Sequence, residues 1–138
     1  MGTVFADTNY LVALLDPKDN LHEKARQISA SLPPSRIVTT DFVLTEMLRL
    51  FSDDGEDFRQ VAVRTATQLR NDPNSEVIPA SRALFDRALD VYASHKDKKW
   101  DLVDCSSFVT MREKGITEAL THDEHFVQMG FRALLRET

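Results

Sequence analysis

The sequence predicts an α/β fold in which one domain, residues 1–138, is built around a mostly parallel central sheet of about five strands. Two observations predict this class. Short apolar, β-prone segments alternate with longer segments whose apolar residues recur at helical spacing. The chain has 138 residues, of which 42% are hydrophobic, and this is enough to bury one core. Strands that alternate with helices pair in parallel, because each helix returns the chain across the sheet.

The first half of the chain is expected to form two strands and four helices. Capping residues indicate the helix starts, and apolar residues three and four positions apart indicate the helix bodies. In the third helix, the residues expected to face the core are Phe42, Val43, Met47 and Leu50. The expected elements, in order, are a strand over 3–6, a helix over 8–15, a helix that Asn20 caps and Pro33 stops, a strand over 36–39, a helix that starts at Thr40 or Asp41, and a helix over 56–69.

The second half repeats this alternation with three strands and two helices. Ser81 is a good cap for a helix with Leu84 and Ala88 on its core face. Asp101 can cap a helix that ends at Gly115, a favourable residue after a helix C-terminus. The expected elements, in order, are a strand over 76–78, a helix from Ser81, a basic loop over 95–99, a helix from Asp101 to Gly115, a strand over 118–121 and a strand over 131–135.

Charge and cysteine content limit the partners of the protein. Seventeen Lys and Arg residues against 22 Asp and Glu residues give a net charge of −5, so RNA or DNA would need a local basic patch or bound cations. The single cysteine, Cys105, excludes an internal disulfide and fits a reducing compartment. The longest strongly apolar stretch, 11–15, is too short to span a bilayer, and no segment resembles a signal peptide. We therefore expect a soluble cytoplasmic protein with no membrane partner.

Asp7 interrupts an otherwise apolar opening, and its position suggests a function. It falls at the carboxyl end of the first predicted strand, which is where open α/β sheets bind their ligands. Asp123 follows the fourth strand and is expected at the same edge of the sheet. Both residues also have structural explanations: Asp7 could cap the first helix, and Asp123 could form an Asx-turn.

Two further acids lie on apolar helix faces. Glu46 falls on a helical line between Phe42 and Leu50, and Asp104 shares a face with Phe108. Four carboxylates in a dry site would repel one another, and a hard divalent cation with oxygen ligands is the usual solution. The four acids therefore predict a metal site.

Other charged residues have simpler interpretations. Arg49 could neutralise Glu46 at the end of its helix. Asp16 and Asp19, like the acids in 53–57, are expected in solvated turns. His122 and His125 could suggest zinc, but the absence of cysteine ligands speaks against a structural zinc site.

Four short motifs occur in order along the whole chain. They are Val4–Asn9, Thr40–Glu46, Trp100–Phe108 and Leu120–Phe126, and Asn20–Ala25 adds a fifth similarity. Together they resemble the PIN domain, and within that family the VapC-like ribonucleases of bacterial toxin–antitoxin pairs. The resemblance implies a three-layer α/β/α fold and a metal-dependent endoribonuclease that hydrolyses RNA phosphodiester bonds at an acidic Mg²⁺ or Mn²⁺ site.

The resemblance also assigns the residues of this site. The implied catalytic and metal-binding quartet is Asp7, Glu46, Asp104 and Asp123. Asn9 and Thr121 match the polar positions that support it. The sequence departs from the family pattern at two positions before the third acid, where Asp101 replaces a serine and Val103 a threonine. Asp101 could add to the metal site or simply cap its helix, and we favour the cap.

The resemblance implies three partners: an RNA substrate, a cognate antitoxin that blocks the acidic site, and a second copy of the chain in a homodimer. Met47, Leu48 and Phe51 could form an apolar groove for an antitoxin helix, although core packing is the favoured use for most of them. A non-toxin RNA-processing nuclease of the same family and a non-catalytic RNA- or protein-binding module are the alternatives. A phosphate-accepting Asp7 is a further alternative, but Asn9 stands where that pattern needs a second acid.

Substrate contacts are predicted around the basic loop, which leads directly into the helix of Asp104. Cations there would guide the RNA backbone, and an aromatic ring, Trp100 or Phe126, would stack on an unpaired base. The predicted substrate-binding residues are Arg49, Lys98, Lys99, Trp100 and His125, with Lys96 in the same loop.

Overall fold

The computed structural model describes residues 2–137 and contains one sheet of five parallel strands. The strands are β1 (Gly2–Ala6), β2 (Ser35–Thr40), β3 (Ser75–Ile78), β4 (Glu118–Leu120) and β5 (Arg132–Ala133). Their order in the sheet is β3-β2-β1-β4-β5, so β1 lies at the centre. Phe5 of β1 is opposite Val38 of β2 on one side and Ala119 of β4 on the other. The predicted α/β class with a parallel five-stranded sheet is confirmed.

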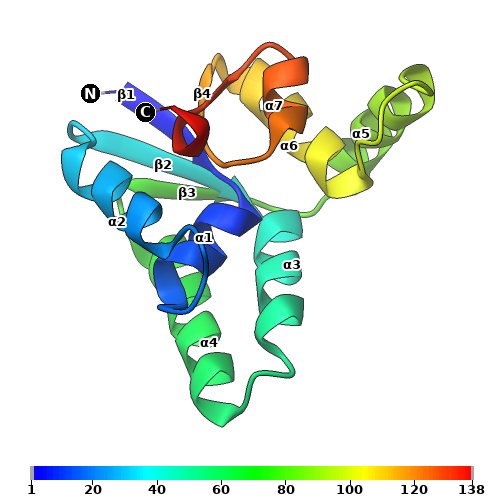
Figure 1. Cartoon of the computed structure of the whole chain (residues 1–138). Coiled ribbons are helices and arrows are strands. Elements are labelled where there is room, and N and C mark those ends of the chain that lie inside the picture. Colours follow the sequence, from blue (N-terminus) through cyan, green and yellow to red (C-terminus); the bar gives the residue numbers. More distant parts are fainter. Residues whose placement is uncertain (1, 138) are drawn as a thin grey trace.

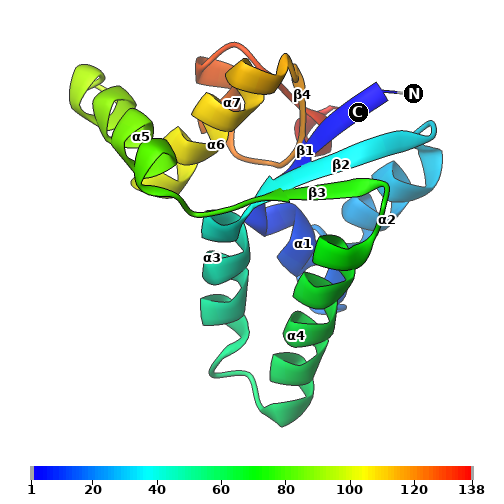
Figure 2. The same ribbon diagram turned by 180° about the vertical axis from the view of Figure 1, so that it is seen from behind.

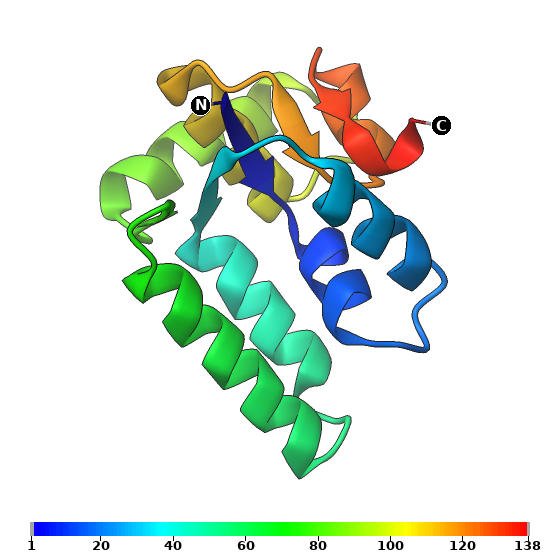
Figure 3. The same cartoon turned by 90° about the vertical axis from the view of Figure 1, so that its left-hand side faces the viewer.

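Helices cover both faces of this sheet. They are α1 (Thr8–Leu15), α2 (His22–Ser31), α3 (Asp41–Phe51), α4 (Glu56–Asn71), α5 (Arg82–Ser94), α6 (Leu102–Lys114) and α7 (Glu124–Gln128). Helices α1 to α4 lie on one side and α6 and α7 on the other, which gives the three-layer arrangement (Figure 1). Helix α5 packs against α6 and reaches beyond the sheet, as the view from behind shows (Figure 2). Helices α3 and α4 form a long antiparallel pair that extends away from the sheet (Figure 3).

Local capping explains most of the helix boundaries. The side chain of Thr40 accepts a hydrogen bond from the backbone N–H of Val43, which fixes the start of α3. The side chain of Ser81 caps α5 in the same way. Helix α6 ends at Gly115, whose left-handed backbone (φ 67°) suits a residue without a side chain. These starts and this end were predicted from the sequence.

The core lies between the sheet and its helices. Large side chains from both halves of the chain are fully buried, and Phe5, Phe51, Phe108, Phe126 and Met47 are the largest of them. Phe108 contacts Phe126 and Trp100 edge to face. Since Met47 and Phe51 pack in this core, they are not free to line a groove, which agrees with the favoured interpretation.

One prediction about helix α2 and one about helix α3 were wrong. Asn20 does not cap α2, because the helix begins after Leu21, whose backbone N–H is held by the side chain of Asp19. Leu50 does not face the core, since 43% of its surface is exposed. A helical line of residues can face a cleft as easily as a core, and helical spacing alone cannot separate the two.

The C-terminal part also differs from the prediction. The five-residue helix α7 was not expected, because it is too short to show helical periodicity. The strand predicted over 131–135 is only Arg132–Ala133, and a 3₁₀ turn follows at Leu134–Arg136. Within residues 2–137, no helix is long and apolar enough to cross a membrane.

Candidate active site

The carboxyl ends of β1 and β4 open into a cleft that gathers acids from five parts of the chain. The cleft has a volume of about 390 Å³. Its lining residues are Asp7, Thr8, Asn9, Val12, Asp19, Glu46, Leu50, Asp101, Asp104 and Asp123. All four predicted acids are among them, and none of the residues in this set is a lysine or arginine.

Asp7 lies at the base of this cleft and is 5% exposed. Its Oδ2 accepts a hydrogen bond of 2.7 Å from the Thr121 hydroxyl. Its side chain makes no capping hydrogen bond to α1, so the capping alternative does not explain it. Burial raises the pKa of Asp7 to about 7, even though the Thr121 hydrogen bond acts in the opposite direction. A carboxylate in this position is stabilised by a nearby positive charge.

Asn9 and Thr121 connect the ends of β1 and β4. The amide nitrogen of Asn9 donates to the Thr121 hydroxyl at 3.2 Å, and its Oδ1 accepts from the backbone N–H of His122 at 3.1 Å. The Thr121 hydroxyl also accepts from the backbone N–H of Asp123 at 3.0 Å. These bonds fix the separation of the two strand ends that carry Asp7 and Asp123.

Asp104 reaches the cleft from the first turn of α6 and is 7% exposed. It forms a reciprocal capping box with Asp101: Asp101 Oδ1 accepts from the Asp104 N–H at 2.8 Å, and Asp104 Oδ2 accepts from the Asp101 N–H at 3.2 Å. Burial and the negative charge of Asp101 raise the pKa of Asp104 to about 6. Asp101 is thus the helix cap that we favoured, and it also lines the cleft.

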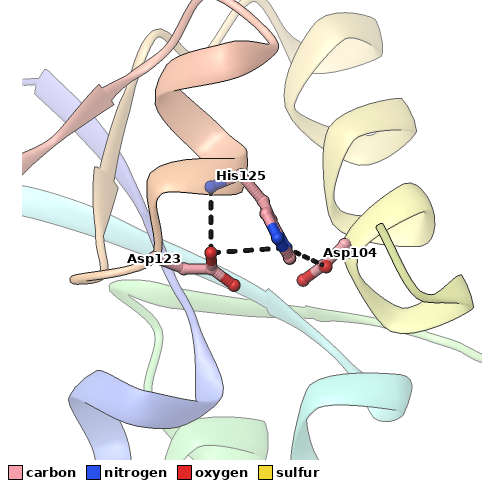
Figure 4. Close-up of side chains that lie close together, drawn as sticks. All are labelled: Asp104, Asp123 and His125. Carbon is pink, nitrogen blue, oxygen red and sulfur yellow. Dashed lines mark hydrogen bonds and ion pairs between the residues drawn. The ribbon is translucent and has the colours of Figure 1, made fainter. Parts of the chain in front are cut away.

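His125 lies between two of the acids, as Figure 4 shows. Its Nδ1 is 2.9 Å from Asp104 Oδ2 and 3.3 Å from Asp123 Oδ1. Burial alone would lower the pKa of His125, but the hydrogen bond to Asp104 and the charge of Asp123 outweigh burial and raise it. One ligand atom from each of the three side chains lies within 4.8 Å of the others, a grouping that can hold a metal ion. His122 does not belong to this group.

Asp123 has a second role at the start of α7. Its Oδ1 accepts a hydrogen bond from the backbone N–H of His125 at 2.9 Å, so it caps the helix. The structural interpretation of Asp123 is therefore correct, and the same carboxylate still borders the cleft.

Glu46 enters the cleft from α3, beside Leu50. The line from Phe42 to Leu50 was predicted to face the core, but at Glu46 it faces this cleft and leaves Glu46 half-buried. None of the ion pairs formed among residues 2–137 includes Glu46 or Arg49. Arg49 is exposed and does not neutralise Glu46.

The donor set of the cleft suits a hard divalent cation. Carboxylate oxygens come from six acids, the predicted quartet together with Asp19 and Asp101, and oxygen ligands are what Mg²⁺ and Mn²⁺ prefer. Thr8, which lines the cleft and is 4% exposed, has a buried hydroxyl for which residues 2–137 supply no hydrogen-bond partner. A hydrated cation would satisfy both the carboxylates and this hydroxyl.

Asp19 was missed by sequence reasoning. It was interpreted as a solvated turn residue, yet it lines the cleft while its Oδ1 accepts from the Leu21 N–H at 2.9 Å. No spacing rule links Asp19 to the other acids, because the loop after α1 reaches the cleft only through the tertiary fold.

The predicted substrate-binding residues separate into two groups. Lys98 and Lys99 are exposed and line a second depression that also includes Asp101. Trp100 is only 5% exposed, and its indole N–H donates to Gln128 at 2.9 Å. Phe126 is fully buried. Rings buried to this degree offer a base little surface for stacking, and the stacking role expected of Trp100 or Phe126 stays a prediction.

Comparison with known proteins gives consistent matches. The family model described as "PIN domain" matches residues 4–132. The curated relatives are the "23S rRNA-specific endonuclease VapC20" of two Mycobacterium tuberculosis strains, CDC 1551 and H37Rv; each is 30% identical over 131 residues, which span 93% of this chain and 95% of the relative.

Solved structures extend this comparison. The crystal structure of M. tuberculosis VapC20, described as a "Sarcin-Ricin loop cleaving toxin", superposes with a TM-score of 0.82 at 29% identity, covering 93% of this chain and 95% of that one. FitAcB from Neisseria gonorrhoeae superposes with a TM-score of 0.68 at 15% identity, covering 94% and 95%, and at this identity the match shows the fold alone.

Proposed function

Because this chain belongs to the PIN-domain family, we propose that it is a metal-dependent endoribonuclease and the toxin of a VapBC-type toxin–antitoxin pair. The observation that carries the proposal is the cleft in which Asp7, Glu46, Asp104 and Asp123 converge with no lysine or arginine among its lining residues. Such a site attracts a divalent cation, because carboxylate oxygens are the ligands that hard cations prefer. The similarity to VapC20, a ribosomal RNA endonuclease, supports RNA as the substrate.

The side chains of the cleft would have different roles in phosphodiester hydrolysis. A bound Mg²⁺ or Mn²⁺ supplies a water of lowered pKa and neutralises charge that develops on the phosphate. Asp7, Asp104 and Asp123 would hold this cation, directly or through water. Asp101 would be an additional metal ligand. Glu46 would serve as a further ligand or as the base that accepts a proton from the attacking water. In-line attack leaves a 5′-phosphate and a 3′-hydroxyl.

The supporting residues keep the acids in place. Thr121 and Asn9 hold Asp7 through the hydrogen bonds at the strand ends. Asp101 holds Asp104 through the capping box. Side chains fixed in this way lose little entropy when a cation binds, and this raises the affinity of the site.

The partners follow from the same proposal. The similarity to VapC20, a ribosomal RNA endonuclease whose solved structure is described as a toxin, supports an RNA substrate and a cognate antitoxin. An acidic cleft suits an inhibitor that inserts a basic side chain. We also propose a homodimer and the cytoplasm as its place of action, since RNA is found there. A phosphate-accepting Asp7 is not favoured, because the residue at position 9 is an asparagine engaged by Thr121 and His122.

The test is cleavage of end-labelled RNA, with 23S rRNA as the first substrate, in Mg²⁺, in Mn²⁺ and in EDTA. Asp7→Asn is expected to abolish cleavage, because the neutral amide cannot hold the cation, while its circular dichroism stays that of the wild type. Asp54→Asn, the same change at an exposed turn, is the matched control and is expected to keep full activity. Full activity of Asp7→Asn, or cleavage that survives EDTA, would contradict the proposal.

A further inference from the structure

A second depression lies next to the acidic cleft, between the end of α5 and the start of α6. It has a volume of about 620 Å³. Its lining residues are Tyr92, Ala93, His95, Lys96, Lys98, Lys99, Trp100 and Asp101. We call it the lysine pocket. Asp101 lines both the lysine pocket and the acidic cleft, so the two depressions are adjacent.

The lysine pocket gathers positive charge in a chain whose net charge is negative. The chain carries a net charge of −5 and has only six lysines, yet three of them, Lys96, Lys98 and Lys99, line this pocket. Lys98 pairs with Asp97 at 3.5 Å, but Asp97 is 75% exposed, and a pair this open is weak. Within residues 2–137, Lys96 and Lys99 form no ion pair. Positive charge is therefore available to a polyanion here.

The inner wall of the pocket is rigid. The ring of His95 packs on Trp100 with 4.8 Å between centroids, and its Nδ1 lies 2.9 Å from the backbone oxygen of Val91. Trp100 is itself held by Phe108 and by the hydrogen bond to Gln128. A wall fixed in this way loses no side-chain entropy when a ligand binds.

One aromatic ring at the pocket is free. Tyr92, near the end of α5, is 53% exposed, whereas Trp100 is buried. An exposed aromatic side chain beside lysines is the combination that single-stranded nucleic-acid sites use: the cations contact the backbone and the ring stacks on a base. The ring suited to stacking is thus that of Tyr92, and not the two rings expected from the sequence.

We propose that the lysine pocket binds a nucleotide next to the scissile phosphate, with its phosphate at Lys98 and Lys99 and its base against Tyr92. This inference rests on the proposed function, because the acidic cleft must hold the scissile phosphate. A base can stack on Tyr92 only when it is unpaired, so the substrate must be single-stranded beside the cleavage position.

An acidic peptide is the other polyanion that lysines attract. The shared border with the cleft favours RNA over such a peptide. A peptide that continued past Asp101 would bring its own carboxylates against the five other acids of the cleft. An RNA strand would instead place its next phosphate beside a divalent cation that neutralises both the phosphate and the acids.

The first experiment removes the two charges. Lys98→Gln/Lys99→Gln is compared with Arg64→Gln/Arg70→Gln, which removes the same charge from exposed positions on α4. We expect the lysine variant to raise KM on the order of tenfold with little change in kcat. We also expect it to lower the slope of log K against log salt by about 0.7, the value for one lost phosphate contact on a single strand. The arginine variant is expected to match the wild type.

The second experiment tests the base contact. A labelled oligonucleotide is titrated by fluorescence anisotropy with Ca²⁺ in place of Mg²⁺, once as a single strand and once as a duplex. Tyr92→Ala is expected to weaken single-strand binding on the order of tenfold, and Tyr92→Phe, which keeps the ring, to restore it. The duplex is expected to bind more weakly than the single strand and to be insensitive to both changes.

The outcomes separate this inference from the proposed function. If the wild type cleaves RNA in Mg²⁺ but the lysine variant behaves like the arginine control, the pocket is not a nucleotide site and the nuclease stands. If the wild type cleaves nothing, yet the lysine and Tyr92 variants lose single-strand binding, the pocket is supported and the nuclease fails. Displacement of RNA by poly-glutamate, with tighter binding of the peptide at these lysines, would instead make the pocket a protein-docking site and overturn the inference.

Discussion

The two ends of the sheet differ in how their carboxylates are paired with cations. At the amino ends of the strands, acids are paired with cations: Arg132 contacts Glu118 and Glu137, and Lys114 lies 3.1 Å from Glu76. At the carboxyl ends, Asp7, Glu46, Asp104 and Asp123 line one cleft that no lysine or arginine lines. The same residue types thus form ordinary surface pairs with lysine and arginine at one end. At the other end they form a group of acids whose one ion-pair partner within residues 2–137 is His125.

This difference indicates where the molecule needs a ligand. Exposed pairs such as those at the amino end contribute little to stability, so their loss changes little. Burial disfavours the charged form of a carboxylate, and burial, with a smaller contribution from neighbouring negative charges, raises the pKa values of Asp7 and Asp104. A fold keeps such an arrangement when a cation that is not part of the chain compensates it.

The largest effect is expected for catalysis. Asp104→Asn should abolish RNA cleavage, because the amide removes one negative ligand and leaves the capping box able to form. Glu118→Gln, the equivalent change at the amino end, should leave cleavage at the wild-type level. The measurement is the initial rate of cleavage in Mg²⁺. Equal losses in the two variants would mean that the ends of the sheet do not differ in function.

The next effect concerns stability and pH. Burial raises the pKa of Asp7 from 3.8 to about 7, so the folded state favours the protonated form. Stability from this group is present below about pH 4 and is lost as the pH rises through 7, a loss of roughly 4 kcal/mol. Asp104 and His125, whose pKa values are also raised, act in the same direction. We expect the Tm in EDTA to fall between pH 5 and pH 8.

Mg²⁺ should reverse this loss, because it stabilises the charged carboxylates. The gain in Tm on adding Mg²⁺ is therefore expected to be larger at pH 8 than at pH 5, and Asp7→Asn should both raise the Tm in EDTA at pH 8 and reduce the Mg²⁺ gain. A scan of Tm against pH, with and without Mg²⁺, checks this. A Tm in EDTA that rises toward pH 8 would show that the ionised acids of the cleft do not destabilise the fold.

The comparison also explains what the sequence could predict. Caps and apolar spacing are local, and they placed α1 over its observed bounds and α6 between Asp101 and Gly115. Asp7 could be placed at the sheet edge because the carboxyl ends of parallel strands meet there. The four acids of the quartet could then be grouped, because Asp7 and Asp123 follow strands, Glu46 and Asp104 lie on apolar helix faces, and the family resemblance assigns the same four residues.

What could not be predicted depends on contacts between distant segments. His125 was predicted to contact substrate, and the sequence did not reveal that α7 places it between Asp104 and Asp123. Trp100 was expected at the surface, since it follows a basic loop, but the contact with Phe108 buries it. Asp19 and Leu50 reached the cleft for the same reason: a loop or helix face has no local signal for what it meets across the fold.

A smaller effect is expected for the residues that hold Asp7. Thr121→Val removes a hydroxyl that bonds to Asp7, Asn9 and Asp123 while keeping the shape of the side chain. The affinity for Mn²⁺ should fall by about 10- to 100-fold, as is usual when a group behind a metal ligand is lost. Isothermal titration calorimetry measures it, with Thr117→Val at an exposed position as the control. Unchanged affinity would mean that Thr121 only fills space.

The smallest effect, a change in the free energy of unfolding, is expected at the amino ends of the strands. Lys114→Gln breaks the pair with Glu76, but both side chains are more than a third exposed and Glu76 keeps Arg36 at 3.7 Å, so the loss should be below about 1 kcal/mol. Screening by salt should remove even this difference, since these charges face solvent. Urea unfolding at low and high salt checks both points. The contradicting result would be a loss of unfolding free energy in Lys114→Gln that equals the gain in Asp7→Asn and persists at high salt. Charge would then be buried at both ends of the sheet, and the acidic cleft would not differ from the amino end in its need for a cation.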